Sequence, residues 1–218
     1  MQEVDAKLHA QLASGVTALG LDLDQVKLKQ MLRFVSELER WNQSYNLTSI
    51  RLAKDMVTRH LLDSLTLAPF IGSESVLDIG TGAGLPGVPL AVALPEARFV
   101  MVDSNGKKVR FVRHAIRTLR LGNAQALQSR AEELDLAACN AESGFDVVVA
   151  RALASLSTLG QWCRNALATN GRLLAMKGPQ AQSEMDQTPD GFKVVAVHPL
   201  SVPGLAAERQ LIELEKTV

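Results

Sequence analysis

The first third of the chain has apolar residues at helical spacing. Within residues 25–45 this stripe comprises Leu28, Met31, Leu32, Val35, Leu38 and Trp41. Asp22 or Asp24 is suitably placed to cap the segment. A second helical pattern begins near residue 51 and ends around Pro69 and Gly72. We therefore expect residues 1–72 to form a helical extension.

From residue 73 the pattern changes to short apolar runs separated by helical segments. Strands are predicted at 76–79, 99–102, 124–128, 145–149 and 173–176, and helices at 86–94, 106–121 and 155–169. Such an alternation is typical of a mostly parallel sheet with helices on both faces. The last two runs, at 192–200 and 208–215, have no helix between them and should form an antiparallel hairpin at the sheet edge. Residues 73–218 are thus predicted to be a doubly wound, Rossmann-like α/β domain with a seven-stranded sheet.

Composition narrows the class of protein. With 218 residues, 47% of them hydrophobic, the chain can bury one main core plus an extension. Lys and Arg balance Asp and Glu at 23 each, so a nucleic-acid partner would have to bind a local basic patch. Cys139 and Cys163 have neither zinc-site nor disulfide spacing, and no metal site is expected. Without a membrane-length apolar run or a leader pattern, we expect a cytoplasmic protein.

The stretch SVLDIGTGAGLPG, residues 75–87, is a predicted strand followed by a glycine-rich turn. Gly80, Gly82, Gly84 and Gly87 allow tight turns and a close approach of a ligand to the backbone. In open α/β sheets, ligands bind beyond the carboxyl ends of the strands. Three of these glycines also match the dinucleotide fingerprint, a match that is weak by itself.

Two carboxylates narrow the ligand further. Asp103 ends the next predicted strand, where it can accept hydrogen bonds from ribose hydroxyls; its alternative role is to cap the following helix. Asp78 precedes the first glycine, and a carboxylate there favours a ligand with a cationic end over a pyrophosphate. S-adenosylmethionine, with its sulfonium and ammonium groups, fits this pattern. A nicotinamide dinucleotide remains the alternative.

Several ordered motifs resemble one known family. They are RWNQSYNLTSI, RHLLDSL, LDIGTGAGLPGVPLA, VDSNGKKVRFV, SRAEEL, VVVARALASL and LLAMKG. Together they are similar to the bacterial small-subunit rRNA methyltransferase G family, formerly called glucose-inhibited division protein B. The resemblance covers about residues 35–178. It implies a class I methyltransferase that transfers a methyl group from S-adenosylmethionine to N7 of one guanine in the decoding-region loop of 16S rRNA. We expect the protein to be a monomer.

The resemblance also implies a set of site residues. For the cofactor it implies Gly80, Leu85, Asp103, Ala131, Glu132 and Arg151, and the pattern of the glycine loop adds Asp78 and Gly82 to this set. Arg151 would in addition lie at the site of methyl transfer, where it could donate to guanine O6 or to a phosphate. Its alternative role is an ion pair with Asp78 or Glu132.

Methylation at guanine N7 also agrees with what the sequence lacks. N7 presents an unprotonated lone pair, so no general base is needed, and no convincing pair of nucleophile and base is present. His60 is interpreted as a structural histidine, with Arg59 beside it as a candidate for the pocket lining. Lys177, at the end of a predicted strand, is a weaker candidate for contact with RNA or cofactor.

A run of basic residues supplies the candidate RNA contacts. Between residues 104 and 131 there is no Asp or Glu. The predicted RNA-binding residues are Lys107, Lys108, Arg110, Arg113 and Arg117. The alternative is an ordinary solvated helix face. Trp41 and Tyr45 could stack on bases, although packing against the sheet is the favoured interpretation.

Two other functions stay open at this point. A nicotinamide-dependent oxidoreductase would use the glycine fingerprint, and a non-catalytic RNA-binding assembly factor would retain only a vestigial pocket.

Overall fold

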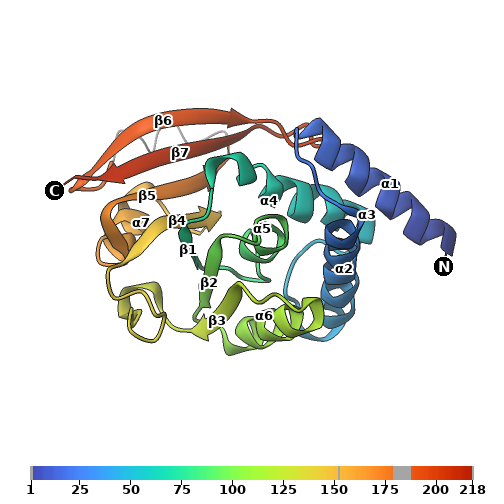
Figure 1. The fold of residues 1–218 in the computed structure, drawn as a ribbon, viewed down its shortest axis with the longest axis horizontal. Coiled ribbons are helices and arrows are strands. Elements are labelled where there is room, and N and C mark those ends of the chain that lie inside the picture. Colours follow the sequence, from blue (N-terminus) through green and yellow to red (C-terminus); the bar gives the residue numbers. More distant parts are fainter. Residues whose placement is uncertain (1, 152, 179–187, 218) are drawn as a thin grey trace.

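The computed structural model describes residues 2–151, 153–178 and 188–217 (Figure 1). Its helices are α1 (Gln2–Ala18), α2 (Gln25–Tyr45), α3 (Ala53–Met56), the π-helix η1 (Val57–Leu62), α4 (Asp63–Leu65), the 3₁₀ turn η2 (Ala68–Phe70), α5 (Gly87–Ala93), α6 (Gly106–Leu119), the 3₁₀ turn η3 (Ala131–Glu133) and α7 (Leu156–Cys163). Its strands are β1 (Ser75–Ile79), β2 (Arg98–Asp103), β3 (Ala124–Gln128), β4 (Phe145–Arg151), β5 (Leu167–Lys177), β6 (Phe192–Leu200) and β7 (Arg209–Lys216).

One seven-stranded sheet organises the molecule, in the order β3-β2-β1-β4-β5-β7-β6. The first five strands in this order are parallel, whereas β7 runs antiparallel to β5 and pairs with β6 as an edge hairpin. The strand order reverses between β1 and β4, which places a crevice at the carboxyl ends of these two strands. The expected α/β architecture is confirmed.

The two faces of the sheet carry separate apolar cores because side chains alternate along each strand. Val76 of β1 and Phe99 of β2 point into the larger core, which the helices α1 to α6 cover. Leu77 and Val100 point into the other core, which α7 and the segment before β4 cover. Figure 1 shows the N-terminal helices gathered beyond one face and α7 on the other side.

The N-terminal helices share the larger core with the sheet. Asp24 caps α2 by accepting a hydrogen bond of 2.8 Å from the backbone N–H of Lys27. Further along α2, Phe34 packs on Phe111 of α6 with ring centroids 5.9 Å apart. Trp41 lies against Phe111 as well, with ring centroids 5.6 Å apart, and packs against the core that this helix shares with the sheet.

Two local predictions differ from the structure. The helix expected over 155–169 ends at Cys163, because β5 begins at Leu167 and pairs there with Phe145 of β4. The helix expected from residue 51 is interrupted by the π-helix η1. Such insertions occur frequently at functional sites because they redirect side chains.

Candidate active site

Two cavities open at the carboxyl ends of the parallel strands. The first has a volume of about 260 Å³ and lies over β1, β2 and the segment after β3. Its lining residues are Ile79, Gly80, Val102, Asp103, Ser104, Lys108, Ser129, Arg130, Ala131, Glu132, Leu153 and Trp162. The predicted residues Gly80, Asp103, Ala131 and Glu132 are therefore brought together in one place, although they come from three separate segments.

Asp78 fixes the conformation of the glycine loop through two hydrogen bonds. It is fully buried, and its Oδ2 accepts hydrogen bonds from the Thr81 hydroxyl at 2.6 Å and from the backbone N–H of Gly87 at 2.8 Å. A Cβ on Gly87 would lie 2.6 Å from that same oxygen, so only glycine allows this approach. The carboxylate thus ties the beginning of the loop to the first residue of α5.

The other oxygen of Asp78, Oδ1, is buried and has no hydrogen-bond partner among the described residues. Burial raises the pKa of this carboxyl from its ordinary value of 3.8 to about 7, against the opposing effects of its hydrogen bonds and of Arg151. A cationic hydrogen-bond donor from a bound ligand would pair with Oδ1 and favour the ionised form of the Asp78 carboxyl.

Asp103 closes the loop from the side of β2. Its Oδ2 accepts a hydrogen bond of 2.9 Å from the N–H of Gly82, and its Oδ1 accepts one of 2.8 Å from the N–H of Asn105. Lys108 Nζ lies 3.9 Å from Oδ2. The cap of α6 is provided by Asn105, which accepts from the N–H of Lys107, and not by Asp103. Since each carboxylate oxygen has a second lone pair, Asp103 can still accept hydrogen bonds from a ligand.

Gly80 opens the first cavity at the end of β1. Its φ of +64° lies in the left-handed region that glycine favours. A Cβ at this position would lie 2.4 Å from the Leu153 side chain. Gly80 and Asp103 line the first cavity, where they fit a nucleoside, whereas Asp78 lies buried under the loop and is not among the residues that line either cavity.

The second cavity lies beyond β4 and β5 and has a volume of about 490 Å³. Its lining residues are Ser49, Ile50, Arg59, His60, Asp63, Arg151, Met176, Lys177, Gly178 and Arg209. Arg59 and His60 belong to η1, and Asp63 begins the next turn. The candidates Arg59, His60 and Lys177 are thus placed in a cavity together with Arg151.

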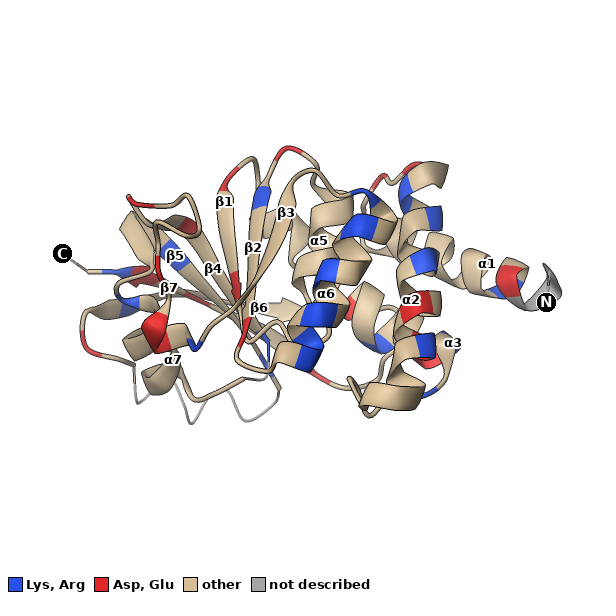
Figure 2. Ribbon diagram, turned by 90° about the horizontal axis from the view of Figure 1, so that it is seen from below, with Lys and Arg blue, Asp and Glu red and all other residues tan. Residues whose placement is uncertain are grey.

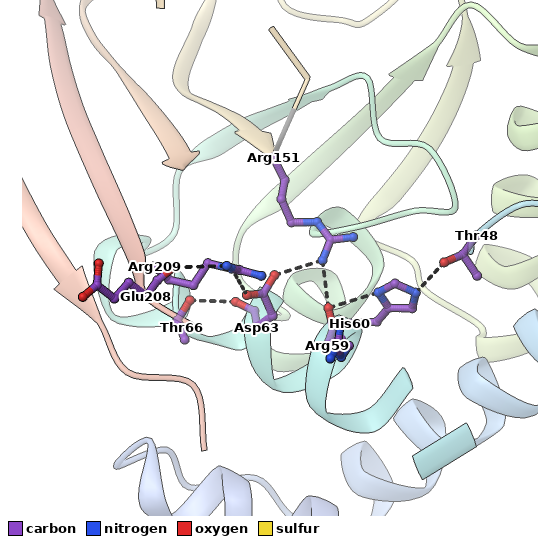
Figure 3. Close-up of polar contacts among 8 residues, drawn as sticks. All are labelled: Thr48, Arg59, His60, Asp63, Thr66, Arg151, Glu208 and Arg209. Atoms are coloured by element: carbon purple, nitrogen blue, oxygen red, sulfur yellow. Dashed lines mark hydrogen bonds and ion pairs between the residues drawn. The ribbon is translucent and has the colours of Figure 1, made fainter. Parts of the chain in front are cut away.

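Arg151 is held by Asp63, at the centre of the network in Figure 3. Its Nη1 donates to Asp63 Oδ2 at 3.0 Å and to the main-chain oxygen of Arg59 at 3.2 Å. On its other side, Asp63 Oδ1 accepts from Arg209 Nε at 3.1 Å. The ion pair considered for Arg151 with Asp78 or Glu132 is therefore made instead with Asp63.

His60 is buried and neutral. Its Nδ1 lies 3.1 Å from the main-chain oxygen of Arg59, which can only accept, so this nitrogen carries the proton. Its Nε2 then accepts a hydrogen bond of 2.9 Å from the Thr48 hydroxyl. Burial and the neighbouring Arg151 lower the pKa of His60 to about 4. These contacts agree with a structural histidine.

Other predicted residues lie outside the first cavity. Leu85 is 4% exposed and belongs to the larger core, so it is not among the residues that line either cavity. Gly82 contributes its N–H to Asp103 instead of lining the cavity. The sequence interpretation missed Asp63 and Arg209. A lone acid within the apolar run LLDSLTL was the available signal for Asp63.

The basic residues of α6 form an exposed face. Figure 2 shows Lys and Arg repeated along α6 and also along the neighbouring α2. Lys107, Arg110 and Arg117 are exposed on α6, whereas Arg113 also donates from Nε to the main-chain oxygen of Ala126 at 2.9 Å. Lys108 lines the first cavity, so it differs from the other four residues of this set. Contact of this face with RNA stays a prediction.

The strand order with an antiparallel β7, the glycine loop after β1 and the acid at the end of β2 define a class I methyltransferase fold. Residues 27–212 match the model of a family described as rRNA small subunit methyltransferase G, and the chain belongs to this family. The ribosomal RNA small subunit methyltransferase G of Alteromonas mediterranea is 41% identical over 98% of this chain and 99% of that protein. The protein of the same name from Stenotrophomonas maltophilia is 47% identical over 95% and 94% of the two chains.

Solved structures share the fold at low sequence identity. TrmN from Thermus thermophilus gives a TM-score of 0.55 at 19% identity and covers 82% of this chain and 52% of that one. TYW2 from M. jannaschii, solved in complex with AdoMet, gives a TM-score of 0.54 at 12% identity, over 72% and 75% of the two chains. Across the described ranges, no helix has the length and apolar character needed to cross a membrane.

Proposed function

We propose that this small-subunit rRNA methyltransferase transfers a methyl group from S-adenosylmethionine to N7 of one guanine in the decoding-region loop of 16S rRNA. The observation that carries the proposal is the position of Arg151 beside both parts of the site. It ends β4, which pairs with β1 where Asp78 lies opposite Val149, and it lines the second cavity. Methyl donor and target base would therefore meet near the end of β4.

The first cavity is the proposed cofactor site. When bound there, S-adenosylmethionine supplies a methyl group activated by the positive sulfur. Asp103 would accept hydrogen bonds from the ribose, Ala131 and Glu132 would lie beside the adenine, and Gly80 would leave room for the chain between sulfur and ribose. Asp78 Oδ1 would accept a hydrogen bond from the ammonium group.

The groups around the second cavity support a reaction that needs no general base. Asp63 is bound by two arginines, and His60 is neutral with both ring nitrogens engaged. A base is unnecessary at guanine N7, because the attacking lone pair carries no proton. Catalysis would rest on orientation and on the electrostatic environment of the transfer.

The exposed basic face of α6 is the proposed surface for the RNA backbone. Lys107, Arg110 and Arg117 would form ion pairs with phosphates, so binding would weaken as salt concentration rises. Arg110→Glu combined with Arg117→Glu should weaken RNA binding and leave the cofactor dissociation constant unchanged. Lys29→Glu combined with Lys54→Glu, at exposed positions of α2 and α3, is the matched charge control.

The function is tested by incubating the protein with labelled S-adenosylmethionine and small ribosomal subunits from a strain that lacks it. Mass mapping of the product should then find one 7-methylguanine in the decoding-region loop. Label on another atom or another nucleotide would reject the proposed target, whereas binding of a nicotinamide cofactor in preference to S-adenosylmethionine would favour the oxidoreductase.

A further inference from the structure

The second cavity has an excess of positive charge. Among the described residues that line it, Arg59, Arg151 and Arg209 carry guanidinium groups, and Asp63 carries the one carboxylate. A methyl-transfer site needs no such excess for a neutral base. A cavity with several cations and one acid instead matches an anionic ligand.

Its guanidinium groups also retain unused donors. Arg151 bonds only through Nη1, so its Nε and Nη2 have no partner in the part of the chain that the structure describes. Arg209 uses Nε for Asp63 and Nη1 for the main-chain oxygen of Glu208, which leaves Nη2. The guanidinium of Arg59 makes no hydrogen bond or ion pair within the described ranges.

We propose that the second cavity contains a phosphodiester subsite for the RNA strand, in which Arg59 and Arg209 bind the backbone phosphate next to the target guanosine. This subsite rests on the proposed function. The proposal also makes Asp63 the positioning residue that keeps Arg209 and Arg151 in place.

The chemistry of the target atom favours phosphate over the base as the partner of these donors. Arginine commonly recognises guanine by binding O6 and N7 together. That contact would occupy the N7 lone pair that must attack the methyl group. Phosphate oxygens, by contrast, match the fork of guanidinium donors and are bound strongly as charge-assisted hydrogen bonds.

Asp63 fixes the directions of both arginines. It is 3% exposed, and each of its oxygens accepts from a different guanidinium. Asparagine at this position would leave Arg151 and Arg209 without a counter-charge, and their guanidinium groups would be free to turn towards solvent. Asp63 itself touches no proposed ligand, so its effect on RNA binding passes through Arg209 and Arg151.

The subsite is tested by titrating guanosine 5′-monophosphate and guanosine into the full chain saturated with S-adenosylmethionine, followed by calorimetry. The nucleotide should bind more tightly than the nucleoside. Arg209→Gln and Asp63→Asn should each weaken nucleotide binding by about tenfold or more, because charge-assisted hydrogen bonds are lost. Equal binding of nucleotide and nucleoside, or an unchanged nucleotide affinity in Arg209→Gln, would overturn the assignment.

Matched controls separate positioning from folding. Lys29→Gln, at an exposed position of α2, removes one positive charge elsewhere and should leave nucleotide affinity unchanged. If Asp63→Asn does not fold, Arg59→Gln replaces it, since Arg59 is exposed and makes no side-chain bond to a described residue. The cofactor dissociation constants of Arg209→Gln and Arg59→Gln should equal that of the wild type.

Methyl transfer to small subunits distinguishes failure of the subsite from failure of the function. For Arg209→Gln we expect the KM for the subunit to rise by about tenfold while kcat changes little, because the lost phosphate contact is made equally in the ground state and the transition state. Transfer by the wild type with an unchanged KM in the variant would refute the subsite and leave the function intact. If the wild type transfers no methyl group but Arg209→Gln loses nucleotide binding, the function is refuted and the subsite is supported.

Discussion

Replacing Asp78 with asparagine should change how the stability of the ligand-free protein depends on pH. Burial raises the pKa of Asp78 from 3.8 to about 7, so the folded protein holds this proton more tightly than the unfolded chain. The stabilisation that this bound proton gives to the folded protein is therefore fully present below about pH 4 and is lost as the pH rises through about 7. Asparagine keeps an oxygen for Thr81 and Gly87 but does not titrate.

The size of the effect follows from the pKa change. A rise from 3.8 to about 7 corresponds to about 4 kcal/mol of unfolding free energy, at about 1.4 kcal/mol for each tenfold change. More than half of this, about 2.5 kcal/mol, falls between about pH 5 and about pH 8. Burial of the asparagine amide lowers the unfolding free energy by an amount that does not depend on pH. This amount cancels when the change in unfolding free energy with pH is compared between the two proteins.

Urea unfolding of both proteins across that pH range measures the difference. The unfolding free energy of the wild type should fall, relative to that of Asp78→Asn, as the pH rises. In the wild type, cofactor affinity should increase over the same range, since the ammonium group favours the ionised carboxyl. Parallel stability profiles for the two proteins would refute the titration of Asp78.

Three further outcomes are expected. Gly80→Ala should lose about 1–2 kcal/mol of stability, because alanine disfavours the left-handed backbone at this position, and should bind the cofactor more weakly. Adding Leu153→Ala should relieve only the clash between the new Cβ and the Leu153 side chain. Thermal unfolding measures the stability of these variants, and calorimetry measures their cofactor affinity. Asp103→Asn should weaken cofactor binding by about tenfold, with an unchanged dissociation constant arguing against the ribose contact. Cys139 and Cys163 are buried, and burial raises the pKa of the Cys163 thiol to about 12, so a thiol reagent should modify them only after denaturation; rapid labelling of the folded protein would contradict their burial.

The sequence predicted the sheet well because its signals are local. A parallel strand buried on both faces is a short apolar run, and each such run proved to be a strand. The glycine loop and Asp103 were predictable for the same reason, since the loop joins two adjacent elements and the acid ends the next strand. Prediction failed at the end of α7, because pairing of Leu167 with Phe145 overrides a weak helical pattern.

The second cavity could not be found in this way. Asp63 lies 88 residues from Arg151 and 146 residues from Arg209, and the three come together only when β4, β7 and the helical extension pack around one edge of the sheet. Periodicity reports which side of an element is buried but not which distant charge lies opposite it. Gly80 and Asp103 of the first cavity were therefore predictable from local patterning, and Ala131 and Glu132 from the family resemblance, whereas the arginine network of the second cavity depends on long-range packing.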